Sequence, residues 1–271
     1  MGDKMQKSYT IGAVILVVAL FAGLALILVS RQESAPGGET TGLDESLEAA
    51  RANLDAGEYD AAIADLEAAV EADPGNSEAH FLLGQVYNKK GQLLDAADEF
   101  RTVIELNPED AAAAHHNLGV TYLQLEDLGA AIAEFEAAIR LEPDDPDTRY
   151  QLGAAYLYLA LGSGDTQQLM AQAQAEFETA LELKENMPQA LVGLGNIYNQ
   201  QANHAAAIQV LQQAIEQAPD LPEAYYALGE AYAMSGDVAK ACETYGQFME
   251  MDALPLWKDQ GRQVMTALGC P

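Results

Sequence analysis

The sequence is poor in basic residues. Its 271 residues include 13 Lys and Arg against 42 Asp and Glu, which gives a formal net charge of -29. Equal numbers of the two signs precede Leu43, so the whole of this charge falls on the chain that follows. A strongly acidic surface repels phosphate backbones and anionic lipid, which argues against nucleic acid and against docking flat on a membrane. The same charge also serves simply to keep helices soluble.

Motifs that carry chemistry are scarce as well. The chain has two cysteines, and it contains no set of cysteines at metal-binding spacing, no phosphate loop and no nucleophile elbow. His115 and His116 are adjacent, so on a helix they would point about 100° apart and would not readily chelate one ion. We therefore predict no enzyme activity, no cofactor, no metal and no small-molecule substrate.

Acidic residues gather in one short stretch, which also calls for a prediction. Glu142, Asp144, Asp145 and Asp147 flank a pair of prolines. A weak cation site is conceivable there, but the glycine-centred pattern of a calcium loop is missing. Packing and turn formation are the favoured roles.

One long segment lacks charged residues altogether. Residues 11–30 are mostly Val, Leu, Ile and Ala, and at about 1.5 Å per residue a helix of this length spans a bilayer core. No convincing cleavage site follows, so an uncleaved transmembrane anchor is favoured over a signal peptide. Lys4 and Lys7 favour a cytoplasmic segment at 1–10, and 31–42 is a flexible linker. The expected location is the bacterial cytoplasmic membrane, single-pass, with the remaining chain on the periplasmic side.

A pattern recurs six times after this segment. It consists of Leu-Gly-x-x-Tyr, then Ala, then a large apolar residue four positions later, and usually Pro. The cleanest copies are Leu83, Gly84, Tyr87, Ala96, Phe100, Pro108 and Leu118, Gly119, Tyr122, Ala131, Phe135, Pro143. Small residues opposite large ones let two helices pack closely as a hairpin. Since a single hairpin cannot bury its apolar face, neighbouring hairpins must stack.

The spacing resembles the tetratricopeptide repeat family, which has about 34 residues in each helix-turn-helix unit. The resemblance implies an all-α, right-handed solenoid of six repeats over residues 43–271. The repeats are expected at 43–76, 77–110, 112–145, 146–187, 188–221 and 222–254, and a capping helix at 255–269. Gly57, Gly91 and Gly236 fall where a first helix would end in a left-handed residue.

Two repeats depart from the pattern. The first has Ala50 where Gly is usual and Asn53 where Tyr is usual, as expected of an N-terminal cap. In the fourth, Ala173 and Phe177 arrive eight residues late. We interpret the extra stretch, residues 161–168, as a longer hairpin.

In this family the first helix of each repeat lines a concave groove. The matching positions are mostly amides, tyrosines and other uncharged residues: His116, Asn117, Val120, Tyr150, Gln151, Tyr158, Val192, Asn196, Asn199, Gln200, Tyr226 and Glu230. Amides can bond the backbone of an extended peptide and rings can pack its side chains. The same residues also suit an ordinary solvated helix surface. The family's carboxylate-gripping variant uses Lys, Arg and Asn, of which only the asparagines have counterparts here.

Cys242 and Cys270 are the only cysteines. A capping helix that runs antiparallel to the helix of Cys242 would bring Cys270 back toward it, so a disulfide is possible in an oxidising compartment. The alternative is that Cys242 is a small buried hydrophobic residue.

The sequence supports two candidate functions. The first is a membrane-anchored scaffold that binds a partner protein or peptide in the concave groove. The alternative is an assembly chaperone for exported clients, as in cytochrome maturation, pilus or secretion systems. Dissociation of the client after it folds would separate the two.

Overall fold

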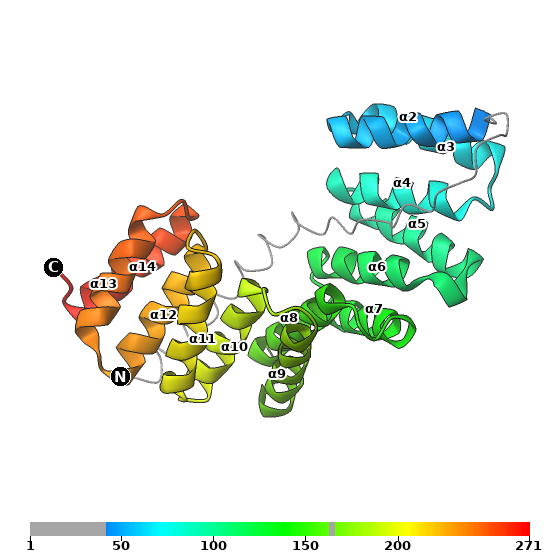
Figure 1. Ribbon diagram of the computed structural model, residues 1–271. Helices are drawn as coiled ribbons and strands as arrows, with labels where there is room; N and C mark the ends of the chain where they lie inside the picture. Colours follow the sequence, from blue (N-terminus) through cyan, green and yellow to red (C-terminus); the bar gives the residue numbers. More distant parts are fainter. Residues whose placement is uncertain (1–41, 163–165) are drawn as a thin grey trace. The chain divides into compact units, whose positions relative to one another are not determined.

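The computed structural model describes residues 42–162 and 166–271, and every regular element within them is helical (Figure 1). The all-α prediction is therefore confirmed for these residues. The predicted anchor at 11–30 and the segments at 1–10 and 31–41 lie outside them. Among the helices described, none combines the length and the apolar character needed to cross a membrane.

The chain forms two compact units that meet in sequence at residues 143 and 144. The described N-terminal unit is a stack of three hairpins. Its helices are α2 (Gly42–Ala56), α3 (Tyr59–Ala72), α4 (Ser77–Lys89), α5 (Leu93–Leu106), α6 (Ala112–Gln124) and α7 (Leu128–Leu141), with a short 3-10 helix η1 (Pro108–Asp110) before α6.

The C-terminal unit is built in the same way from three hairpins and one further helix. Its helices are α8 (Pro146–Gly162), α9 (Thr166–Leu183), α10 (Pro188–Gln200), α11 (His204–Gln217), α12 (Pro222–Ser235), α13 (Val238–Glu250) and α14 (Pro255–Leu268). The hairpin of the predicted insertion contains the two longest described helices, with 17 residues in α8 and 18 in α9.

The contact of small with large residues explains why each hairpin closes. A Cβ atom added to Gly84 would lie 2.8 Å from the Phe100 ring, and one added to Gly195 would lie 2.5 Å from Leu211. Real Cβ atoms are not found so close, so the two helices of a hairpin pack at a distance that only glycine permits. The repeated alanine beside this contact, as at Ala96 and Ala207, is completely buried. The first repeat uses Ala50 and Leu66 instead, both in its core.

The turns inside the hairpins need a left-handed residue. Gly57, Gly91 and Gly236 have φ angles of 77°, 75° and 88°, as the sequence predicted. The same conformation occurs at Glu126 and Ala202, with φ of 60° and 57°. These two residues occupy the position of Gly91 and Gly236 in their own repeats, and their side chains make this conformation costly.

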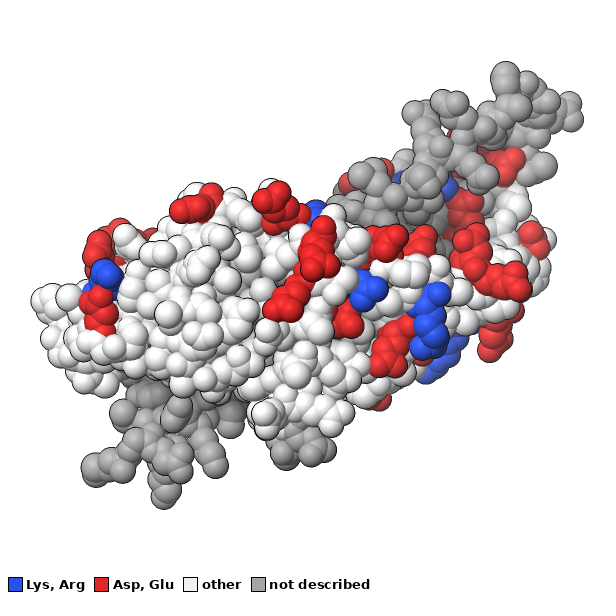
Figure 2. All heavy atoms as spheres, turned by 60° about the horizontal axis from the view of Figure 1, so that its bottom comes forward, with Lys and Arg blue, Asp and Glu red and all other residues white. Residues whose placement is uncertain are grey.

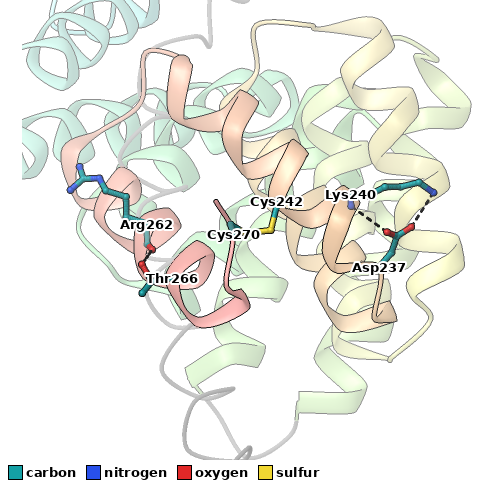
Figure 3. The surroundings of a disulfide bond; sticks show 6 residues. All are labelled: Asp237, Lys240, Cys242, Arg262, Thr266 and Cys270. Atoms are coloured by element: carbon teal, nitrogen blue, oxygen red, sulfur yellow. Dashed lines mark hydrogen bonds and ion pairs between the residues drawn. A yellow bond between two sulfur atoms is a disulfide. The ribbon is translucent and has the colours of Figure 1, made fainter.

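The C-terminal end is closed by α14. Trp257 is 2% exposed and its ring lies 5.9 Å from that of Tyr226, while Phe248 packs beside both. Figure 3 shows a disulfide between Cys242 on α13 and Cys270 just after α14, with Cα atoms 5.4 Å apart. This bond joins the chain end to the last repeat and fixes the capping helix in place.

Candidate partner-binding face

The first helix of each hairpin contributes to one layer of its unit. In the C-terminal unit α10 contacts both α8 and α12, and in the N-terminal unit α4 contacts α2 and α6. Each first helix also packs against the second helix of its own hairpin, as α10 does against α11 (Figure 1). We call the surface of α8, α10 and α12 the first-helix face of the C-terminal unit.

Half of the predicted groove residues are buried. Their exposed fractions are 2% for His116, 8% for Tyr150, 8% for Gln151, 6% for Val192, 5% for Asn199 and 3% for Tyr226. Little of these side chains is in contact with solvent. Residues of the second helices pack against several of them, as Phe135 of α7 does against His116 and Phe177 of α9 does against Tyr150. Their role as partner contacts stays a prediction.

Tyr226 shows the reason for this burial. Its ring centroid lies 5.6 Å from that of Tyr245 and 5.4 Å from that of Phe248, both on α13. Trp257 of α14 stacks on it with an interplanar angle of 18°. The aromatic side chain that the sequence placed in the groove is thus part of the packing of the last repeat against the capping helix.

The other predicted residues keep contact with solvent. Gln200 is exposed, and the remaining members are partly exposed: Asn117, Val120, Tyr158, Asn196 and Glu230. Asn117 donates from Nδ2 to the Ala113 carbonyl of its own helix at 2.8 Å. Three of these residues, Tyr158, Asn196 and Gln200, lie on α8 and α10 of the C-terminal unit, where they can meet a partner.

Asn199 links two first helices. Its Nδ2 donates to the backbone carbonyl of Ala227 on α12 at 3.2 Å. Because a carbonyl oxygen can only accept, this bond fixes the orientation of the amide, and Oδ1 is the free end. Oδ1 is buried and has no hydrogen-bond partner among the described residues.

Two carboxylates flank Ala227 on α12. Glu223 lies one turn before it and Glu230 one turn after it, so all three share a face of the helix. Part of the Glu230 side chain reaches solvent, but its carboxylate is desolvated, which raises its pKa to about 7. Burial also raises the pKa of Glu223, and a hydrogen bond to its own backbone N–H offsets part of this.

Tyr150 of α8 lies close enough to Glu223 for the two groups to interact electrostatically. Burial raises its pKa well above the usual value, and the neighbouring Tyr158 and Glu223 raise it further. The sequence analysis did not single out Glu223. Its spacing of two helical turns from Glu230 was the signal that could have found it.

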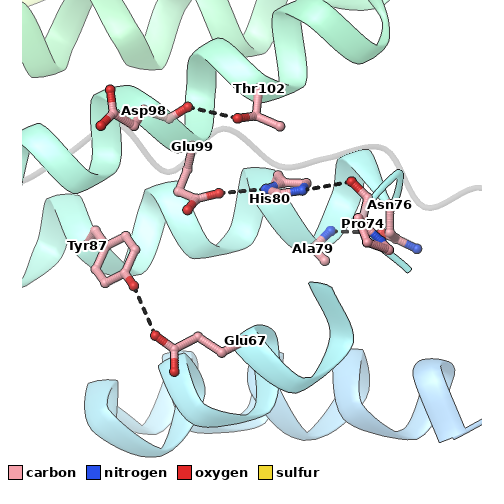
Figure 4. Close-up of polar contacts among 9 residues, drawn as sticks. All are labelled: Glu67, Pro74, Asn76, Ala79, His80, Tyr87, Asp98, Glu99 and Thr102. Carbon is pink, nitrogen blue, oxygen red and sulfur yellow. Dashed lines mark hydrogen bonds and ion pairs between the residues drawn. The ribbon is translucent and has the colours of Figure 1, made fainter. Parts of the chain in front are cut away.

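The sequence analysis also missed polar contacts between basic and acidic side chains inside the hairpins. His80 Nδ1 lies 2.6 Å from Glu99 Oε2, and its Nε2 lies 3.1 Å from the Pro74 carbonyl (Figure 4). The equivalent contacts are His115 with Glu134 at 2.6 Å and Arg149 with Glu176 at 2.8 Å. Each base lies three residues before the repeat Leu and each acid one residue before the large apolar residue, so the repeat spacing contains this signal. His115 is therefore engaged in a structural contact.

Among the described residues, acidic side chains outnumber basic ones on the visible surface drawn in Figure 2. Within the described parts of the chain, no three His, Cys, Asp or Glu side chains are grouped to hold a metal ion. This includes the acidic stretch at residues 142–147, where Asp145 accepts hydrogen bonds from the backbone of Asp147 and Thr148.

Comparison with known sequence families gives a consistent result. Tetratricopeptide repeat models match residues 47–111 and 223–251, and a further model, described as TPR repeat, matches 121–159 and 195–236. Together these matches cover more than half of the chain. A search of curated proteins gives no match.

Solved structures show the same fold. A tetratricopeptide repeat protein from Parabacteroides merdae has a TM-score of 0.70 at 19% identity, with 83% of this chain and 86% of that chain covered. PilF of Pseudomonas aeruginosa has a TM-score of 0.69 at 18% identity, with 83% and 97% covered. YrrB, described as a TPR protein with an unusual peptide-binding site, has a TM-score of 0.58 at 21% identity, with 74% and 97% covered.

Proposed function

Because the chain belongs to the tetratricopeptide repeat family, we propose that it is a membrane-anchored scaffold that binds a partner protein or peptide on its first-helix face. The fold is of a kind that typically holds other proteins and carries no catalysis. Two proteins of similar fold are described by their binding: YrrB has a peptide-binding site, and Cut9 forms a hetero-tetramer with Hcn1.

The observation that carries the proposal is the exposure of polar side chains on the first-helix face. Tyr158, Asn196 and Gln200 lie on α8 and α10 and keep contact with solvent, whereas the packing positions beside them are buried. Amides and a tyrosine ring can together bond the backbone and pack the side chains of a bound segment.

The location is part of the same proposal. The uncharged segment 11–30 serves as an uncleaved anchor, and Lys4 and Lys7 orient it with the N-terminus inside. The disulfide between Cys242 and Cys270 supports an oxidising compartment, because such bonds persist outside the cytoplasm. The repeats then lie on the periplasmic side of a bacterial cytoplasmic membrane.

Two measurements test the location. A C-terminal alkaline phosphatase fusion should be active, and the mature protein should begin near Met1. An inactive fusion contradicts the orientation, and a mature start near Glu33 contradicts the anchoring.

Partner binding is tested by crosslinking in the native membrane followed by mass spectrometry. The variant Y158A/N196A/Q200A should lose the crosslinked partner while its circular dichroism stays that of the wild type. A matched control, Q209A/Q213A, removes exposed amides from α11 and should retain the partner. Equal loss in both variants would contradict binding on the first-helix face.

A further inference from the structure

Glu223, Glu230 and Asn199 form a cluster on the first-helix face that we call the acceptor cluster. We propose that it binds a basic segment of the partner by receiving Lys or Arg side chains. This inference rests on the proposed function and specifies the chemistry of the partner. It is carried by the position of the three groups, by the two buried acceptor atoms among them that lack a donor and by the charge of the unit around them.

The two glutamates lie on one face of α12, and Asn199 of α10 reaches the backbone between them. The Asn199 amide is held against the Ala227 carbonyl at 3.2 Å, and Ala227 lies between Glu223 and Glu230 on the same face of the helix. The two glutamates are two turns apart, which corresponds to about 10 Å along the helix axis. The cluster therefore has room for two cationic groups of an extended segment.

Two acceptor atoms of the cluster lack a donor. Asn199 Oδ1 and Glu223 Oε2 are buried and have no hydrogen-bond partner among the described residues. Glu230 has no ion pair within the described part of the chain, although its carboxylate is desolvated. Because an unpaired buried acceptor costs free energy, the cluster is left unsatisfied until a donor reaches it.

The described C-terminal unit does not supply that donor. Four of its Lys and Arg residues pair with other acids, namely Arg149 with Glu176, Lys184 with Asp147, Lys240 with Asp237 and Arg262 with Asp259. The fifth, Lys258 on α14, has no ion pair with either glutamate. The central helix α10 carries no Lys, Arg, Asp or Glu at all. None of the described Lys and Arg residues of this unit forms an ion pair with the cluster, and we assign the cation to the partner.

The chemistry of the cluster selects the ligand. Two carboxylates and an amide oxygen match the donors of an ammonium or guanidinium group, and they repel a carboxylate or phosphate. Tyr158 of α8 is partly exposed and lies near Tyr150, which is itself close to Glu223, and its ring favours cations with apolar stems. A basic peptide segment satisfies all of these conditions.

The experiment measures fluorescence anisotropy of a labelled lysine-containing peptide with the full-length protein at physiological ionic strength. The variant E223Q/E230Q keeps shape and removes both charges, and it should weaken binding about tenfold or more. The same peptide with glutamine in place of lysine should bind the wild type as weakly. The matched control E216Q/E243Q removes two exposed charges from α11 and α13 and should change affinity by less than about twofold.

The outcomes separate the possible explanations. Equal weakening by E223Q/E230Q and E216Q/E243Q would show diffuse attraction to the acidic surface and would overturn the proposal. Unchanged binding by E223Q/E230Q would also overturn it. In native crosslinking, retention of the partner by E223Q/E230Q and its loss from Y158A/N196A/Q200A would reject the acceptor cluster and leave the proposed function standing. Retention by both variants would reject the proposed function itself.

Discussion

Gly119 on α6 and Phe135 on α7 meet so closely that a Cβ atom on the glycine would lie 2.6 Å from the phenylalanine ring. Phe135 is completely buried. The glycine in the repeated pattern is therefore set by the distance between two helices. The conformation of its own backbone is ordinary.

Gly119→Ala should destabilise the N-terminal unit by about 1 to 3 kcal/mol, because the added methyl group overpacks a full core. The measurement is the urea dependence of the circular dichroism signal. Gly129→Ala is the control, since Gly129 is exposed and its nearest neighbour would lie 3.7 Å from the new Cβ atom. It should stabilise by about 0.5 kcal/mol through helix propensity. Destabilisation of similar size in both variants would contradict the packing argument.

Ala202→Gly should stabilise the C-terminal unit by about 0.5 to 1 kcal/mol. Ala202 adopts a φ of 57°, which is costly for any residue with a Cβ atom. The converse change, Gly236→Ala, places a side chain at a φ of 88° and should destabilise by about 1 kcal/mol or more. No atom lies within 4 Å of the new Cβ at Gly236, so a loss there reports the backbone alone. Thermal unfolding measures both changes.

Much of the fold could be predicted from the sequence, because the repeat places small and large residues at fixed distances. Gly84 opposite Phe100 is sufficient to predict a close helical hairpin. The left-handed residues Glu126 and Ala202 were not predicted, because no glycine marks them. Only their alignment with Gly91 and Gly236 in the other repeats could have identified them.

The candidate site was predicted less completely than the fold. A repeat position specifies which helix faces inward, but the size of the neighbouring side chains decides whether a residue is covered. Tyr226 is covered because Phe248 and Trp257 close over it, and this depends on the capping helix that follows only the last repeat. The sequence analysis did not identify Glu223, because an acidic residue near a helix start is common on any solvated helix.

Tyr226→Ala should destabilise the C-terminal unit by about 3 to 5 kcal/mol, because it removes a ring from contact with three other rings. Tyr158→Ala, at a partly exposed position of α8, should cost much less, about 1 kcal/mol. Chemical denaturation of the two variants makes the comparison. Similar losses would contradict the assignment of Tyr226 to the core and of Tyr158 to the surface.

Glu230→Gln should raise stability, and the gain should grow with pH. The folded protein holds the carboxyl proton up to a pKa of about 7, whereas the unfolded chain releases it near the ordinary glutamate pKa of 4.5. Below the unfolded value both states are protonated and the variant gains nothing. As pH rises through the folded value the wild type loses stability, and the variant should exceed it by about 1 to 2 kcal/mol at pH 8, since partial exposure screens the charge. Urea unfolding at pH 4.5 and pH 8 measures this difference, and a gain independent of pH would contradict it.

The disulfide between Cys242 and Cys270 should contribute stability to the C-terminal unit alone. It closes a loop with a sequence separation of 28 residues, for which the chain-entropy model gives about 3 to 4 kcal/mol. Unfolded, unreduced protein should show no free thiol, and reduction should expose both. The variant C242S/C270S should lose a similar free energy and should exchange the amide protons of α14 faster, since the capping helix is then held only by packing such as that of Trp257. Reductant added to this variant should change nothing, which separates loss of the bond from other effects of reduction. Two free thiols in the unreduced protein would refute the bond in the cell and remove the support that it gives to a periplasmic location.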